Sequence, residues 1–222
     1  MYFRFLIDDT TGCVSYLLAD DSQGVAVLID PRLADLAVIN GMLDEKKLAL
    51  KWVLRTHSHP TEKPLGPDSL QLPSACFVGA GPLGSVPSNL TFGSEQLQLI
   101  ATPGHTCACL SYLWRDRLFC GGLLAADACP YQPRPECPAS LWDSANRKVF
   151  TLPNETLLFG GHSRGGRVVS TVMEQRSTHP WFAGASRDDF LSRFTPVSGV
   201  QHHPTHSICQ EFRTEKSPHE TN

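Results

Sequence analysis

The sequence has few of the features that mark a membrane-bound or nucleic-acid-binding chain. Its 222 residues contain no run that approaches the ~20 apolar residues a membrane-spanning helix needs. Neither sign of charge dominates, because 19 Lys and Arg stand against 22 Asp and Glu for a net charge of −3. We therefore expect neither a nucleic-acid nor a membrane partner. With 41% hydrophobic and 18% charged residues, the composition predicts a globular protein with one sizeable core.

The eight cysteines also lack a familiar pattern, since no CxxC pair occurs. This argues against a zinc ribbon and against a thioredoxin-like redox motif. The N-terminal stretch MYFRFLIDDT is not typical of a signal peptide, because its apolar run is short and ends in two aspartates. We therefore expect a cytoplasmic protein whose thiols are reduced and mostly buried.

Strand and helix signals alternate in the first part of the chain. Two apolar runs joined by a polar turn predict two strands over residues 13–31. Apolar residues at helical spacing predict an amphipathic helix over 33–47, and a nearly continuous apolar run predicts a buried strand over 49–56. His57 and His59 follow directly after this strand.

Strand signals continue further along the chain and then give way to helices. The expected elements are a strand and a Pro-Gly turn over 95–106, a hairpin over 109–122, a rigid proline-rich loop over 128–138, a helix over 141–152, a strand and then a Gly-rich turn carrying His162 over 155–166, and short helices over 168–177 and 186–194. Residues 1–197 are expected to form one domain, and the polar residues 198–222 a disordered tail. Two packed sheets flanked by helices satisfy this order.

Four histidines lie at the ends of predicted strands, namely His57, His59, His105 and His162. Because the ends of parallel strands meet at one edge of a sheet, we expect the four side chains to share a site. Neutral imidazole is a common ligand of Zn and Fe(II), so the pattern predicts a metal site at this edge. The alternative is that the histidines are structural and their placement is chance.

Three motifs carry a resemblance to a known family. THSHP at 56–60, TPGHT at 102–106 and LLFGGHSRGG at 157–166 resemble, in this order and spacing, the metallo-β-lactamase superfamily. Longer stretches, including LKWVLRTHSH and SRDDFLSRF, are similar to its persulfide dioxygenase branch, with glyoxalase II as a more distant relative. The resemblance covers about residues 3–195. It implies an α/β fold, a four-layer αββα sandwich with the metal at one edge of the two sheets.

The metal ligands depart from the pattern of these relatives. The usual first motif is THxHxDH, and here Thr61 and Glu62 replace its aspartate and last histidine. In binuclear relatives such as glyoxalase II these two positions hold the second metal ion, so the resemblance argues against a two-metal hydrolase. In persulfide dioxygenases the resemblance implies one Fe(II), held at the positions of His57 and His105 and by an aspartate. Gly122 stands at the aspartate position and has no ligand atom. Asp127 would reach the site only if its loop folded back.

The residues expected to contact the substrate also differ from those of the relatives. The arginine that relatives place on the glutathione-binding side is replaced by Tyr131. Arg134, in the same proline-rich loop, is the alternative cation for a glutathione carboxylate. We therefore expect a small thiol or glutathione persulfide as the partner, contacting these two residues. The family further suggests a homodimer and, as an alternative compartment, the mitochondrial matrix, although no transit peptide is recognised.

Three functions are compatible with these residues. The inherited one is Fe(II)-dependent oxidation of glutathione persulfide to sulfite by O₂. The second is a non-catalytic relative that uses the pocket for binding or regulation. The third is a mononuclear Zn thioester hydrolase of glyoxalase II type, with histidine ligands and Glu62 as base. Cys107, Cys109 and Cys129 are expected to be small buried residues, and the alternative is a thiol that carries sulfur or binds metal.

Overall fold

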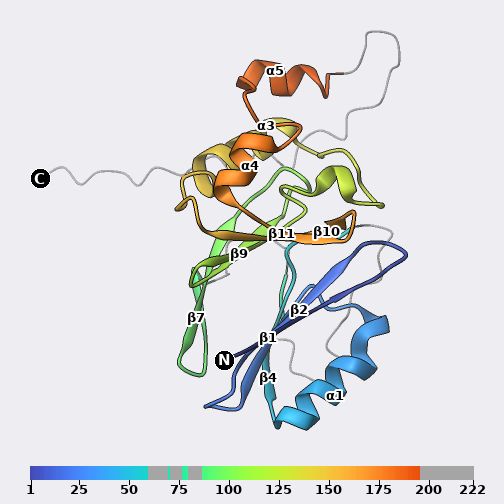
Figure 1. Ribbon diagram of the computed structural model, residues 1–222, viewed down its shortest axis with the longest axis vertical. Helices are drawn as coiled ribbons and strands as arrows, with labels where there is room; N and C mark the ends of the chain where they lie inside the picture. The colour runs from blue at the N-terminus through green and yellow to red at the C-terminus, as the bar shows by residue number, and fades with distance from the viewer. Residues whose placement is uncertain (60–69, 71–76, 80–86, 196–222) are drawn as a thin grey trace, which may run out of the picture.

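Two β-sheets stacked between helices form the fold in a computed structural model, which describes residues 1–59, 70, 77–79 and 87–195 (Figure 1). The strand orders are β1-β2-β3-β4-β5 and β11-β10-β9-β8-β7-β6. The strands of the first sheet are β1 (Tyr2–Ile7), β2 (Val14–Asp20), β3 (Val25–Ile29), β4 (Ala49–Leu54) and β5 (Phe77–Val78). Those of the second are β6 (Asn89–Phe92), β7 (Glu95–Ala101), β8 (Leu110–Trp114), β9 (Arg117–Gly121), β10 (Leu157–Arg164) and β11 (Arg167–Thr171).

The helices lie on the outer faces of both sheets. They are α1 (Leu36–Lys46), α3 (Pro138–Ser144), α4 (Val172–Thr178) and α5 (Arg187–Ser192), with a π-helical turn (Ala145–Val149) and 3₁₀ turns (Leu33–Asp35 and Ala126–Ala128). Figure 1 shows α1 beside the first sheet and α3, α4 and α5 beyond the second. Among the described helices, none combines the length and the apolarity that a membrane crossing would require.

Strand β2 shows why the layers stack, since it is buried along its whole length. Side chains alternate between the two faces of a strand. Tyr16 and Leu18 therefore join the core between the sheets, whereas Leu17 and Ala19 pack against the helix side with Ile39 of α1. A third apolar cluster joins the outer face of the second sheet to α3 and α5. This is the four-layer αββα arrangement predicted from the sequence.

Most predicted elements are confirmed, and the differences are strands that were missed or given other bounds. Strand β1 was not anticipated. His162 lies inside β10 and not in the following turn, because the chain stays extended through Gly160 and Gly161 and turns only at Gly165.

The helix predicted over 168–177 is wrong in its first half. Val168 is buried and Val169 is exposed, which is strand alternation, and β11 therefore precedes α4. The side chain of Thr171 caps α4 by accepting a hydrogen bond from Glu174 N–H.

The cysteines divide into two groups. Five described cysteines are outside disulfide bonds, namely Cys13, Cys109, Cys120, Cys129 and Cys137. Cys107 is disulfide-bonded, so the expectation of reduced thiols is wrong for this residue. Cysteine spacing alone does not show which cysteines form a disulfide. The predictions for Glu62 and for the tail at 198–222 fall outside the described residues.

Candidate metal centre

Both sheets contribute histidines to one cluster. His57 and His59 follow β4 of the first sheet, His105 follows β7 of the second, and His162 belongs to β10. The centroids of the four rings lie 4.9–6.5 Å apart, and each residue is at most 6% exposed. The structure thus brings together the four histidines that the sequence singled out. Their role as metal ligands stays a prediction.

The turn that presents His105 depends on a glycine. Gly104 has φ +142°, which side chains rarely adopt, and a Cβ built on it would lie 2.3 Å from the backbone of Leu141. The loop after residue 128 closes on the same turn, because Cys137 N–H donates to Gly104 O at 2.9 Å and Glu136 N–H donates to His105 O at 3.0 Å. His105 is therefore held between α3 and this loop.

His57 is oriented by a chain of hydrogen bonds that begins at Asp30. Thr56 N–H donates to the Asp30 carboxylate at 2.7 Å, and the Thr56 hydroxyl donates to its other oxygen. The single hydroxyl proton is thereby used, so Thr56 Oγ1 accepts the proton of His57 Nδ1, 2.7 Å away. Nε2 of His57 then carries the lone pair. Burial lowers the pKa of His57 well below its usual value, so the ring stays neutral and able to bind a metal.

His105 and His162 each bury a ring nitrogen that has no hydrogen-bond partner in the structure. In His105 this atom is Nδ1, while Nε2–H donates to Gln132 O at 3.3 Å. In His162 it is Nε2, while Nδ1 lies 3.6 Å from Cys13 Sγ. Burial lowers the pKa of His105 to about 4 and that of His162 to about 3. An unsatisfied buried nitrogen costs about 1–3 kcal/mol, a cost that a bound metal ion would offset.

The ring of His105 occupies the space beside Gly122. A Cβ built on Gly122 would lie 2.0 Å from His105 Nδ1, so this backbone has no room for an aspartate side chain. Asp127 does not take over the role, because it forms an ion pair with Arg164 at the surface. The groups of donor atoms lying within 4.8 Å of one another in the described part contain no carboxylate. They are His57, His59 and His162, and His59, His105 and Cys129.

A cavity of about 20 Å³ adjoins His57 and His162, room for about one water molecule or ion. Tyr131 lies on its wall and packs against His59, with 5.4 Å between ring centroids. Arg134, the other residue predicted to bind substrate, is exposed and is absent from this wall. Arg32 and Arg55 are the cations found there. Sequence reasoning missed both, because they come from segments far from the proline-rich loop.

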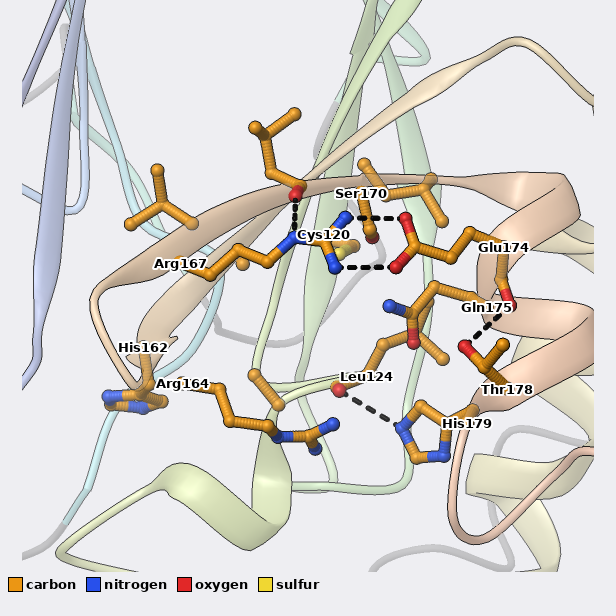
Figure 2. Close-up of a pocket in the computed structure, with 15 residues that line it drawn as sticks. Cys120, Leu124, His162, Arg164, Arg167, Ser170, Glu174, Gln175, Thr178 and His179 are labelled. Carbon is orange, nitrogen blue, oxygen red and sulfur yellow. Dashed lines mark hydrogen bonds and ion pairs between the residues drawn. The ribbon is translucent and has the colours of Figure 1, made fainter.

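A larger cavity of about 180 Å³ lies on the helix side of the second sheet, between β10, β11 and α4. Figure 2 shows the Arg167 guanidinium against the Glu174 carboxylate, joined by two hydrogen bonds of 2.5 Å. His179 Nε2–H donates to Leu124 O at 3.1 Å in the same cavity. His162 lines both cavities. Because Arg167, Glu174 and His179 already have hydrogen-bond partners, this cavity is less suited to a metal ion than the histidine cluster is.

If the ion is held by the all-histidine group that contains His57, replacing Thr56 with valine is expected to weaken metal binding by about 10- to 100-fold, the range found when the outer partner of a metal-bound histidine is lost. Valine keeps the shape but cannot accept the His57 Nδ1 proton, so the ring is no longer held in one tautomer. Titration with Zn or Fe(II), followed by competition with a chelator, measures the effect. Thr56→Ser keeps the hydroxyl and should bind as the native chain does. Equal affinity of both variants would contradict the assigned role of the hydroxyl.

A four-layer αββα sandwich with histidines gathered where its two sheets meet defines the metallo-β-lactamase fold class. No family model matches the chain. Human mitochondrial persulfide dioxygenase ETHE1 is 30% identical over 189 residues, which cover 80% of this chain and 74% of that protein. The chain belongs to the persulfide dioxygenase family of this superfamily.

Two further comparisons fit this assignment. The crystal structure of ETHE1 from Myxococcus xanthus superimposes with a TM-score of 0.75 and 32% identity, covering 86% of this chain and 89% of that one. Hydroxyacylglutathione hydrolase from Rhodospirillum rubrum is 28% identical over 160 residues, 66% of this chain and 60% of that protein. The glyoxalase-type hydrolases are thus related to the chain as well, as the motifs suggested.

Proposed function

We propose that the chain binds one divalent transition-metal ion at the histidine cluster and oxidises a small persulfide with O₂. The observation that carries the proposal is that two buried ring nitrogens of this imidazole cluster, His105 Nδ1 and His162 Nε2, have no hydrogen-bond partner. Buried polar atoms are rarely left unsatisfied, and neutral imidazole is a preferred metal ligand. The donor set therefore fits a metal ion.

The persulfide dioxygenase family implies glutathione persulfide as the substrate and Fe(II) as the metal ion. Bound Fe(II) would supply open coordination positions for O₂ chemistry. The overall reaction consumes one persulfide, one O₂ and one water, and yields glutathione and sulfite. A shell of neutral histidines leaves the full charge of the ion uncompensated, so an anionic sulfur ligand is favoured there.

The chain's own groups would orient the reactants and limit water. Thr56 and Asp30 fix the His57 ring. Tyr131 is 42% exposed and its ring packs against the buried His59, so we assign it to the entrance of the site. Arg55 lines the adjoining cavity and offers a positive charge to an anionic substrate. Tyr131 and Arg55 are thus the residues we assign to substrate binding, with Arg134 placed further out.

The test is metal content followed by a reaction assay. The chain, expressed with added iron and purified without chelator or histidine tag, is expected to carry about one metal ion per chain, and glutathione persulfide should then cause O₂ uptake and sulfite release. His59→Ala, which removes the histidine common to both groups of donor atoms, should lower activity more than about 100-fold, beyond the loss of an outer partner. His179→Gln, in the other cavity, is the control and should keep activity. Iron at one ion per chain without O₂ uptake would contradict the proposed reaction.

A Zn-dependent thioester hydrolase is the second candidate, and the position of Cys129 favours it. Cys129 Sγ lies 3.2 Å from His59 Nε2, and imidazole together with thiolate suits Zn. Zn at about one ion per chain, with cleavage of an S-acylglutathione and no O₂ uptake, would establish this reaction instead. Absence of any bound metal in a folded chain would support the non-catalytic alternative.

A further inference from the structure

We propose that Cys129 supplies the anionic metal ligand that Gly122 lacks, so that His59, His105 and Cys129 hold the metal ion together. The inference rests on the proposed function only in that it requires a metal ion at the cluster. It names a ligand set that differs from the histidine and aspartate set implied by the family. It applies to either candidate reaction.

The three donor groups already lie close to a coordinating arrangement. Cys129 is 1% exposed, and its Sγ lies 3.2 Å from His59 Nε2. One donor atom from each of the three residues lies within 4.8 Å of the others. In a tetrahedral Zn site with bonds of about 2.3 Å to sulfur and 2.0–2.1 Å to nitrogen, donor atoms are about 3.3–3.6 Å apart. Reducing the distances between donor atoms by at most about 1.5 Å, a movement smaller than a change of rotamer, would therefore complete the site.

Hydrogen bonds hold the loop that carries Cys129 against the turn that carries His105. Gln132 N–H donates to Cys129 Sγ at 3.3 Å, and the Gln132 side-chain amide donates to His105 O. A backbone hydrogen bond from Glu136 N–H to His105 O adds a second connection between the loop and the turn. Because these contacts tie residues 129–136 to the His105 turn, the thiol and the imidazole keep a fixed separation. A donor placed this rigidly is preorganised for a ligand.

The charge of the proposed set equals that of the set it replaces. Two neutral imidazoles and one carboxylate bring one negative charge to a divalent ion, and two neutral imidazoles and one thiolate bring the same. The Cys129 S–H bond breaks as the metal–sulfur bond forms, and the proton passes to solvent. Thiolate is a softer ligand than carboxylate, so the exchange moves the metal preference toward Zn.

The competing donor group is His57, His59 and His162, which contains only nitrogen. The two groups share His59, so they are alternatives for a single ion at that residue. A measurement that detects a metal–sulfur bond therefore separates them, whether or not the chain has activity.

The experiment loads the full chain with Co²⁺ and records its absorption spectrum. We expect a sulfur-to-cobalt charge-transfer band in the near ultraviolet from the native chain. Cys129→Ser should lose the band and bind Co²⁺ at least about 100-fold more weakly, beyond the effect of losing an outer partner. Cys137→Ser, a half-buried thiol in the same loop, and Cys13→Ser, beside His162, are matched controls that should keep the band.

Each outcome decides the inference. Bound Co²⁺ without the sulfur band in the native chain overturns it, and leaves the proposed metal site standing with nitrogen ligands. A chain that binds no Co²⁺ overturns both. If Cys129→Ser does not fold, X-ray absorption of the Zn-loaded native chain still decides, because one sulfur at about 2.3 Å is expected and its absence contradicts the proposal. Cys129→Asp should bind metal without the band and carry a larger share of iron when purified.

Discussion

Replacing Gly122 with aspartate is expected to destabilise the chain and weaken metal binding, although it restores the carboxylate that relatives use. A Cβ at this position would lie 2.0 Å from His105 Nδ1 and 2.4 Å from its Cε1, distances that real atoms do not tolerate. His105 is fully buried, so its ring has no solvent-filled space to move into. Overpacking of this kind costs about 1–3 kcal/mol. Displacing His105 also removes one of the proposed ligands.

Urea unfolding of the metal-free variant measures the loss of stability, and a metal titration measures the affinity. Gly122→Ala separates the two effects of aspartate, because it introduces the Cβ without a carboxylate and should be destabilised to a similar degree. Gly41→Ala in α1, where a Cβ would meet nothing within 4 Å, is the control and should be neutral or stabilising by up to about 1 kcal/mol. Tighter metal binding by Gly122→Asp would show that the native site merely lacks a ligand.

The convergence of the histidines could be predicted from the sequence because it depends on topology. His57 and His59 directly follow a strand whose apolar pattern is clear, and His105 follows a Pro-Gly turn. The rule that functional loops gather at one edge of the sheets then places them together. His162 lies at the same site although it was predicted in a turn and is found in a strand. The prediction of the site was unaffected, because the end of that strand and the turn that follows it lie at the same edge of the sheet.

The packing around Gly122 and the side chains that line the cavity could not be predicted in the same way. The sequence shows that Gly122 lacks a carboxylate, but only the packing shows that the His105 ring fills the space beside it. Arg55 lines the cavity through a contact between distant segments, whereas Arg134, the cation nearest to the expected loop, is exposed. Side-chain contacts between segments depend on details of packing that periodicity does not contain.

The metal-free chain is expected to lose stability steeply as the pH falls from about 6.5 to 5. Burial lowers the pKa of His105 to about 4, of His162 to about 3 and of His179 to about 4, and it lowers the pKa of His57 well below its usual value. In the unfolded chain these groups titrate near 6.5. Between the two pKa values the unfolded state binds more protons than the folded state, so the free energy of unfolding decreases as the pH falls.

At pH 5 each of these histidines that stays neutral in the folded state lowers the free energy of unfolding by about 2 kcal/mol. Four such losses add to about 8 kcal/mol, which is comparable to the whole stability of a typical domain. We therefore expect the metal-free chain to unfold near pH 5. Urea unfolding followed by circular dichroism at several pH values would detect this, and a stability that does not change between pH 7.5 and 5 would contradict it.

Saturating Zn should move the acid transition to lower pH, because a metal-bound nitrogen takes up no proton until the metal leaves. The protection should depend on the cluster and not on buried histidine in general. His179→Gln removes one proton-binding group outside the cluster, so it should reduce the pH dependence of the metal-free chain and leave the Zn protection intact. His105→Gln should reduce both. Equal Zn protection in the two variants would mean that the metal ion binds somewhere other than His105, which would exclude the proposed ligand set.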